Sequence, residues 1–265
     1  MYARPLVEKF SEGLVSHLYG NPHSASTPST LAGDRVDEVG IRTLQFFNAD
    51  PGHFDLVFVS NATATIKLAA ESFREYHESS ESNKRQKGFW YGYHRDAHTS
   101  LIEIREFTHG SHRCFRDDEQ VHRWIDESED RAKVKLGPQR TNRSIRFSRP
   151  IEHNGSAVAS NMVCKRAFFS PYASHFAKLL RPAKLRSKKG AKIYTLLDAA
   201  ALATTCLIDL SDEGAPDFTC VSFYKIFGFP NISALIVRKE AGHILQQWKY
   251  FGGGTVDMII ALDNT

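Results

Sequence analysis

The sequence predicts an α/β fold in which a mostly parallel sheet is flanked by helices. Short apolar runs of strand-like composition alternate along the chain with segments of helical periodicity. Of the 265 residues, 42% are hydrophobic and 24% are charged, which is ordinary for a globular protein with a full core. Because this length allows one large domain or two modest ones, the order of the elements decides the fold class.

Two helices, a strand and a third helix are expected first. Apolar residues recur with helical spacing in residues 7–18 and again in residues 31–47, where Pro51 and Gly52 follow as a stop signal. Residues 55–59 predict a short buried strand. A new helical pattern begins at Ile66, soon after that strand.

The middle of the chain predicts fewer elements. Residues 78–88 are polar and charged, which predicts a surface loop. Residues 89–93 predict a strand, a helix is expected to open at His98, and residues 143–147 lead to another strand. Residues 126–140 are charged and indicate no particular element.

Three further strands are expected in residues 193–197, 220–223 and 234–237. The basic stretch 178–192 precedes them and supplies much of the net charge of +4. Lysines suit a helix C-terminus followed by a solvated loop, whereas a nucleic-acid patch usually interleaves aromatic residues with its cations. No aromatic residue interrupts this stretch, so we expect a solvated loop and no nucleic-acid binding.

Cysteine usage and hydropathy indicate a cytoplasmic protein. The four cysteines lie far apart and lack metal-ligand spacing, which favours reduced thiols and no metal site; they are Cys114, Cys164, Cys206 and Cys220. The N-terminus lacks an apolar leader, and no run reaches the roughly 18 apolar residues of a membrane span. We therefore expect no contact with a membrane.

An anion site is conceivable where the strand at 55–59 meets the next helix. The first N–H groups of a helix and its positive end favour anions, and Thr63 adds a hydroxyl donor. Serine and threonine also cap helices without binding a ligand. Gly252–Gly254 and Thr255 could likewise approach an anion closely, although a flexible tail is the alternative.

Two residues of the central region suit a conjugated ring as ligand. His98 could stack on such a ring and move protons, although with twelve histidines a surface or cap position is the alternative. Asn154 could donate a hydrogen bond to a phenolate-like oxygen, although Asn154 and Gly155 also favour a plain turn.

Asp198 and Lys225 form the pair that indicates a cofactor. Asp198 ends an apolar run, at the edge where α/β sheets bind ligands, with a helix N-cap as its alternative role. Lys225 follows a strand and precedes Gly228 and Pro230, so we expect it on a constrained loop at the same edge. A lysine forms a Schiff base with the aldehyde of pyridoxal phosphate (PLP), and a carboxylate keeps the pyridine nitrogen protonated. Burial would favour the neutral amine that this reaction requires.

The order of these segments resembles the aminotransferase class V group of fold-type-I PLP enzymes. Within that group the chain is most similar to the N-terminal, cysteine-desulfurase-like part of eukaryotic molybdenum cofactor sulfurases. Tyr224 and Ala201 stand where ordinary cysteine desulfurases carry histidine and glutamine, as in the sulfurase branch. The similar stretches are residues 18–26, 60–68, 98–106, 197–200, 222–230 and 250–255.

The resemblance implies a role for each candidate residue. Lys225 would carry PLP and, with His98, act in catalysis, while Asp198 would pair with the pyridine nitrogen. His98 would stack on the ring and Asn154 would face the ring oxygen. The phosphate would be held by Ala62, Thr63 and Ser222, with the Tyr224 hydroxyl nearby, and Gly254 and Thr255 would reach the phosphate of the other subunit of a homodimer.

The resemblance also implies a domain organisation and an activity. Residues 1–265 are expected to form the PLP-binding large domain of fold type I, truncated at both ends. The small C-terminal domain, with the substrate arginine and the persulfide cysteine, and the molybdopterin-handling domain would be absent. The implied activity is PLP-dependent desulfuration of L-cysteine, which supplies sulfur to the molybdenum cofactor. The alternatives are a catalytically silent domain that binds PLP or dimerises, and another class V cysteine desulfurase or lyase.

Overall fold

The computed structural model describes residues 3–79, 89–117, 119–121, 123–124, 161–166, 193–228 and 230–247. The expected strand near residues 143–147 and the basic stretch 178–192 lie outside these ranges, as do Asn154, Gly254 and Thr255. Within the described ranges the fold class predicted from the sequence is confirmed.

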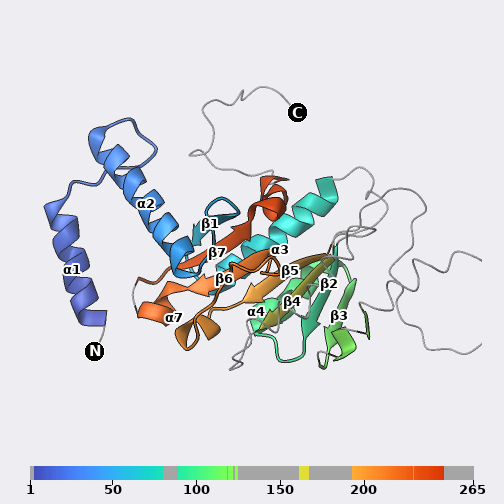
Figure 1. Cartoon of the computed structure of the whole chain (residues 1–265). Helices are drawn as coiled ribbons and strands as arrows, with labels where there is room; N and C mark the ends of the chain where they lie inside the picture. Colours follow the sequence, from blue (N-terminus) through green and yellow to red (C-terminus); the bar gives the residue numbers. More distant parts are fainter. Residues whose placement is uncertain are drawn as a thin grey trace, which may run out of the picture.

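A seven-stranded sheet lies at the centre of the described residues, in the order β1-β7-β6-β5-β4-β2-β3 (Figure 1). The strands are β1 (Phe54–Val59), β2 (Trp90–His94), β3 (His112–Phe115), β4 (Asn161–Arg166), β5 (Ile193–Asp198), β6 (Phe218–Ser222) and β7 (Ser233–Arg238). Neighbouring strands of this sheet pair in parallel, except that β7 is antiparallel to both β1 and β6. The sheet is therefore mostly parallel, as expected.

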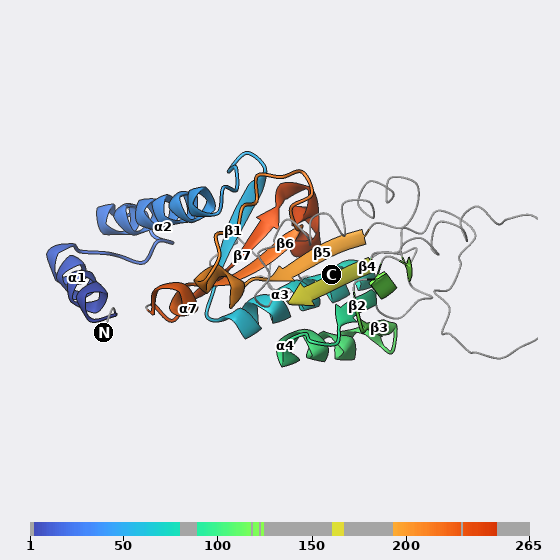
Figure 2. The same cartoon turned by 60° about the horizontal axis from the view of Figure 1, so that its bottom comes forward.

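Helices precede the sheet and connect its strands. The α-helices whose full bounds lie within the described residues are α1 (Ala3–Ser16), α2 (Thr27–Phe46), α3 (Ala62–Ser79), α4 (Thr99–Ile102) and α7 (Phe223–Phe227). The described part of the chain also contains the 3₁₀ segments η2 (Glu103–Thr108), η4 (Leu202–Thr204) and η5 (Lys239–Gln247). Figure 2 shows α1 and α2 to one side of the sheet, whereas α3 runs along its face. Among the described residues, none of the helices is both long enough and apolar enough to cross a membrane.

Both faces of the central strands are covered. On one face α3 packs against β6, β7 and η5, and the ring of Phe73 lies 5.4–5.6 Å from those of Phe89, Tyr194 and Phe218. On the other face Leu197 packs in a cluster that includes Phe47, at the end of α2. Cover on both faces explains why β5 and β6 are buried at nearly every position rather than at alternate positions.

The expectation that Lys225 lies on a loop is wrong. The strand there ends at Ser222, and Phe223 opens α7, so Lys225 lies on a short helix rather than on a loop. The hydroxyl of Ser222 accepts a hydrogen bond from the Lys225 N–H (3.4 Å), which caps the helix. Gly228, with φ of 76°, ends it in the left-handed conformation that glycine tolerates. Lys225 is exposed, so burial does not favour its neutral amine in this structure.

Candidate active site

The carboxyl ends of the parallel strands open onto one cavity of about 250 Å³. Its lining residues come from the start of α3, the start of α4, the end of β5, and the segment that links β6 to β7. They are Asn61, Ala62, Thr63, Ile66, His98, Ser100, Asp198, Ala200, Ala201, Ser222, Tyr224, Lys225 and Asn231. The structure thus brings together seven of the predicted site residues: Ala62, Thr63, His98, Asp198, Ser222, Tyr224 and Lys225.

The start of α3 presents hydrogen-bond donors to this cavity. Asn61 caps the helix, because its Oδ1 accepts a hydrogen bond from the Ala64 N–H (2.9 Å). Ala62 and Thr63 are the first two residues of α3, and the N–H groups of such residues have no acceptor within the helix. The capping role therefore falls to Asn61, and the two N–H groups lie at the positive end of an 18-residue helix.

His98 is fixed at the end of the turn that follows β2. It is the N-cap of α4, and its Nδ1 accepts a hydrogen bond from the Ser100 N–H (3.2 Å). A ring nitrogen that accepts a hydrogen bond carries no proton, so the neutral imidazole holds its proton on Nε2. The capping role, which the sequence left as an alternative, thus coexists with a place on the cavity wall.

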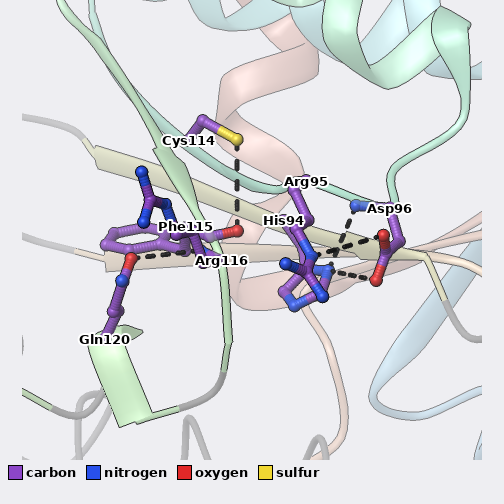
Figure 3. A network of polar contacts seen from close by, with 7 residues as sticks. All are labelled: His94, Arg95, Asp96, Cys114, Phe115, Arg116 and Gln120. Atoms are coloured by element: carbon purple, nitrogen blue, oxygen red, sulfur yellow. Dashed lines mark hydrogen bonds and ion pairs between the residues drawn. The ribbon is translucent and has the colours of Figure 1, made fainter.

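Polar contacts hold the preceding turn in place (Figure 3). The carboxylate of Asp96 lies 3.4 Å from Nδ1 of His94 and 3.6 Å from Nε of Arg95. The N–H of Arg95 donates to the carbonyl of Phe115 on β3 (2.8 Å), and the Ala97 N–H donates to the His94 carbonyl (2.9 Å). The turn that carries His98 is therefore tied to the edge of the sheet.

Asp198 is a buried carboxylate at the end of β5. The residue is 6% exposed, and its Oδ1 accepts a hydrogen bond from the Ala200 N–H (3.1 Å). Burying a carboxylate is costly unless donors or cations compensate its charge. A ligand that presents a protonated nitrogen to Asp198 would supply such compensation.

Cys220 lies between Asp198 and the start of α3. Its buried thiol donates to the carbonyl of Ala62 (3.6 Å), and Cys220 pairs with Asp198 in the register of β5 and β6. Burial raises the pKa of this thiol; the charge of Asp198 raises it further and that of Lys225 lowers it. The raised pKa keeps the Cys220 thiol neutral near neutral pH.

Three polar lining residues had no role in the sequence analysis: Asn61, Ser100 and Asn231. The segment 60–65 signalled a helix cap, but the sequence did not distinguish Asn61 from its neighbours. The contacts of Ser100 span 37 positions, from the start of α4 to the start of α3, and short-range patterns do not reveal them. Among the described residues, no group of three or more histidine, cysteine, aspartate or glutamate side chains has metal-site geometry.

Comparisons with known proteins show extensive similarity in sequence and in fold. No protein-family model matches the chain. It is 48% identical over 261 residues to a molybdenum cofactor sulfurase of Aspergillus fumigatus, and 43% identical over 265 residues to one of Emericella nidulans. These matches cover 98% and 100% of this chain, but the chain spans only 27% and 28% of the length of those relatives. Among solved structures, the cysteine desulfurase CsdA of Escherichia coli is similar with a TM-score of 0.54 and 15% identity, covering 90% of this chain and 51% of that one.

Proposed function

We propose, on the premise that the chain is a homologue of the molybdenum cofactor sulfurases, that it binds PLP and contributes to cysteine desulfuration. One observation carries this proposal: a lysine amine, a buried carboxylate and the start of a long helix line a single cavity. PLP needs these three partners, for its aldehyde, its pyridine nitrogen and its phosphate respectively. The cavity volume of about 250 Å³ is close to the lower end of the range of ligand sites, about 300 Å³.

The residues around the cavity would each bind a different part of PLP. Asp198 would accept a hydrogen bond from a protonated pyridine nitrogen, which also compensates its buried charge. His98 would pack against the ring, and the N–H groups of Ala62 and Thr63 would bind the phosphate. The hydroxyls of Ser222 and Tyr224 line the same cavity and would add donors.

Lys225 would both attach the cofactor and move protons. PLP supplies an electron sink for the substrate when it is bound. Lys225 is exposed towards solvent at the cavity, so its amine is accessible to an aldehyde and to an incoming amino acid. Once displaced by that amino acid, the amine would remain at the cavity as a base.

The proposal also covers the substrate, the sulfur acceptor and the assembly of the protein. L-cysteine would be the sulfur donor and the molybdenum cofactor the final acceptor, because the relatives are named sulfurases of that cofactor and the fold occurs in a cysteine desulfurase. Residues 1–265 would form the PLP-binding domain. Asn154 would face the ring oxygen, and Gly254 and Thr255 would complete the site of a second subunit. We also propose that the protein is cytoplasmic, which the free thiols of Cys114, Cys206 and Cys220 support, and that it forms a homodimer.

The test is an absorbance titration of the purified protein with PLP. A visible band from lysine-bound PLP should appear in the wild type and in Lys67→Ala, a control at an exposed lysine on α3. It should be absent from Lys225→Ala. Asp198→Asn should weaken binding by about 10- to 100-fold, the value of a hydrogen bond to a charged group. If the band persists in Lys225→Ala, Lys225 does not attach the cofactor and the proposal is wrong.

A second measurement separates an enzyme from a silent binding domain. The PLP-loaded protein is incubated with L-cysteine, and alanine and sulfide are quantified. Release of both compounds supports desulfuration by this chain. Binding of PLP without release of either would favour the silent domain.

A further inference from the structure

The hydroxyl of Ser100 joins two parts of the cavity wall that the sequence treats as separate. Its Oγ lies 3.0 Å from Oγ1 of Thr63, at the start of α3, and 3.1 Å from Nδ1 of His98. The same residue donates its backbone N–H to His98 Nδ1 (3.2 Å). All three side chains line the cavity.

The hydrogen bonds that link Thr63, Ser100 and His98 allow only a few consistent positions for their protons. Nδ1 of His98 has a single lone pair, which the Ser100 N–H already engages. The Ser100 hydroxyl proton is therefore free to point at Oγ1 of Thr63. In that arrangement the proton of Thr63 is directed away from Ser100 and is available to a ligand in the cavity.

We propose, on the premise that the cavity binds PLP, that Ser100 is a positioning residue that directs the Thr63 hydroxyl towards the phosphate of the cofactor. When the phosphate accepts a hydrogen bond from the Thr63 hydroxyl, the Ser100 hydroxyl donates a hydrogen bond to Oγ1 of Thr63. Hydrogen bonds in such a chain strengthen one another. The backbone N–H of Ser100 keeps the imidazole of His98 in place throughout, so the two functions of Ser100 are separable.

Because the hydroxyl and the backbone N–H of Ser100 have different roles, the inference predicts how each Ser100 variant binds PLP and pyridoxal. In Ser100→Ala the backbone N–H remains, and so does the position of His98, but the hydroxyl that orients Thr63 is lost. PLP should bind about 3- to 10-fold more weakly, as expected for one lost neutral hydrogen bond. Pyridoxal, which lacks the phosphate, should change by less than about 2-fold, because its ring contacts persist. Ser100→Thr keeps a hydroxyl and should restore the affinity for PLP.

The experiment measures dissociation constants of PLP and pyridoxal by absorbance titration for the wild type, Ser100→Ala, Ser100→Thr, Thr63→Val and the double variant Thr63→Val with Ser100→Ala. Because both hydroxyls act on one phosphate contact, the double variant should bind PLP no more weakly than Thr63→Val alone. A merely structural role of Ser100 would weaken both ligands equally and would add to the effect of Thr63→Val. Either of these results would overturn the inference.

The same titrations distinguish this inference from the proposed function. If the wild type gives no Lys225-dependent band with PLP, the proposed function is wrong and the role of Ser100 is wrong with it. If that band is present and Ser100→Ala binds PLP as tightly as the wild type, only the role of Ser100 is wrong.

Discussion

Replacing single leucines in β5 tests whether both faces of the sheet are covered as the structure has them. Leu196 is 0% exposed and packs in the cluster that contains Phe73 of α3, whereas Leu197 is 2% exposed and packs in the cluster on the opposite face. β5 ends in Asp198, so the packing that holds these leucines also positions the carboxylate of the cavity. Leu207 is 84% exposed and serves as the control.

The expected magnitudes follow from burial. Leu→Ala at a buried site loses the transfer free energy of the deleted atoms and leaves a cavity, which together cost about 2–5 kcal/mol. Leu196→Ala and Leu197→Ala should therefore each lower the free energy of unfolding by that amount. Leu207→Ala should change it by less than about 0.5 kcal/mol, because the side chain is already in water.

Equilibrium unfolding in urea, followed by circular dichroism, measures all three variants against the wild type. The midpoint should fall clearly for the two buried leucines, with an unchanged slope if the unfolded states are alike. If either variant is as stable as Leu207→Ala, that face of the sheet is not covered. The two-layered core, and with it the reasoning that places Asp198, would then be wrong.

Two further changes test local details of the structure. A Cβ at Gly92 would lie 2.8 Å from Cε2 of Phe115, so Gly92→Ala should cost about 1–3 kcal/mol in urea unfolding. Gly40→Ala, in the open on α2, should instead be neutral or stabilise by up to about 1 kcal/mol, and equal stability of the two variants would contradict the close packing at Gly92. Burial raises the pKa of Cys220, so its thiolate forms only at a higher pH than that of an ordinary cysteine. Iodoacetamide at pH 8 should label Cys206, which is partly exposed, and leave Cys220 unlabelled until urea is added; peptide mass spectrometry that finds early labelling of Cys220 would refute its burial.

The sequence predicted the central part of the site because its signals are local. Asp198 ends an apolar run, and Lys225 follows another, so each was placed at the end of a strand without knowledge of the pairing. Parallel strands bring their carboxyl ends to the same edge, and the structure does place both residues on one cavity. Their roles towards PLP remain proposals.

The details that the sequence did not predict depend on competing or long-range signals. Gly228 and Pro230 favoured a loop around Lys225, although Ser222 is also a suitable N-cap and the helix forms between them. β3 was missed because its four residues, His112–Phe115, include two polar positions and lie at the edge of the sheet. The link between Ser100 and Thr63 depends on how α3 and α4 are arranged, which no local pattern encodes.

The antiparallel direction of β7 explains why so short a segment contributes so much of the cavity. If β7 were parallel to β6, the connection between them would have to return to the amino end of the strands before β7 could begin. Because β7 runs antiparallel to β6, the segment between them stays at the carboxyl ends of the parallel strands. This short connection therefore supplies four of the residues that line the cavity, all within ten positions of the sequence: Ser222, Tyr224, Lys225 and Asn231. A lysine on this connection cannot move to the other end of the strands unless a strand is reversed, so the fold keeps Lys225 at the cavity that Asp198 also lines.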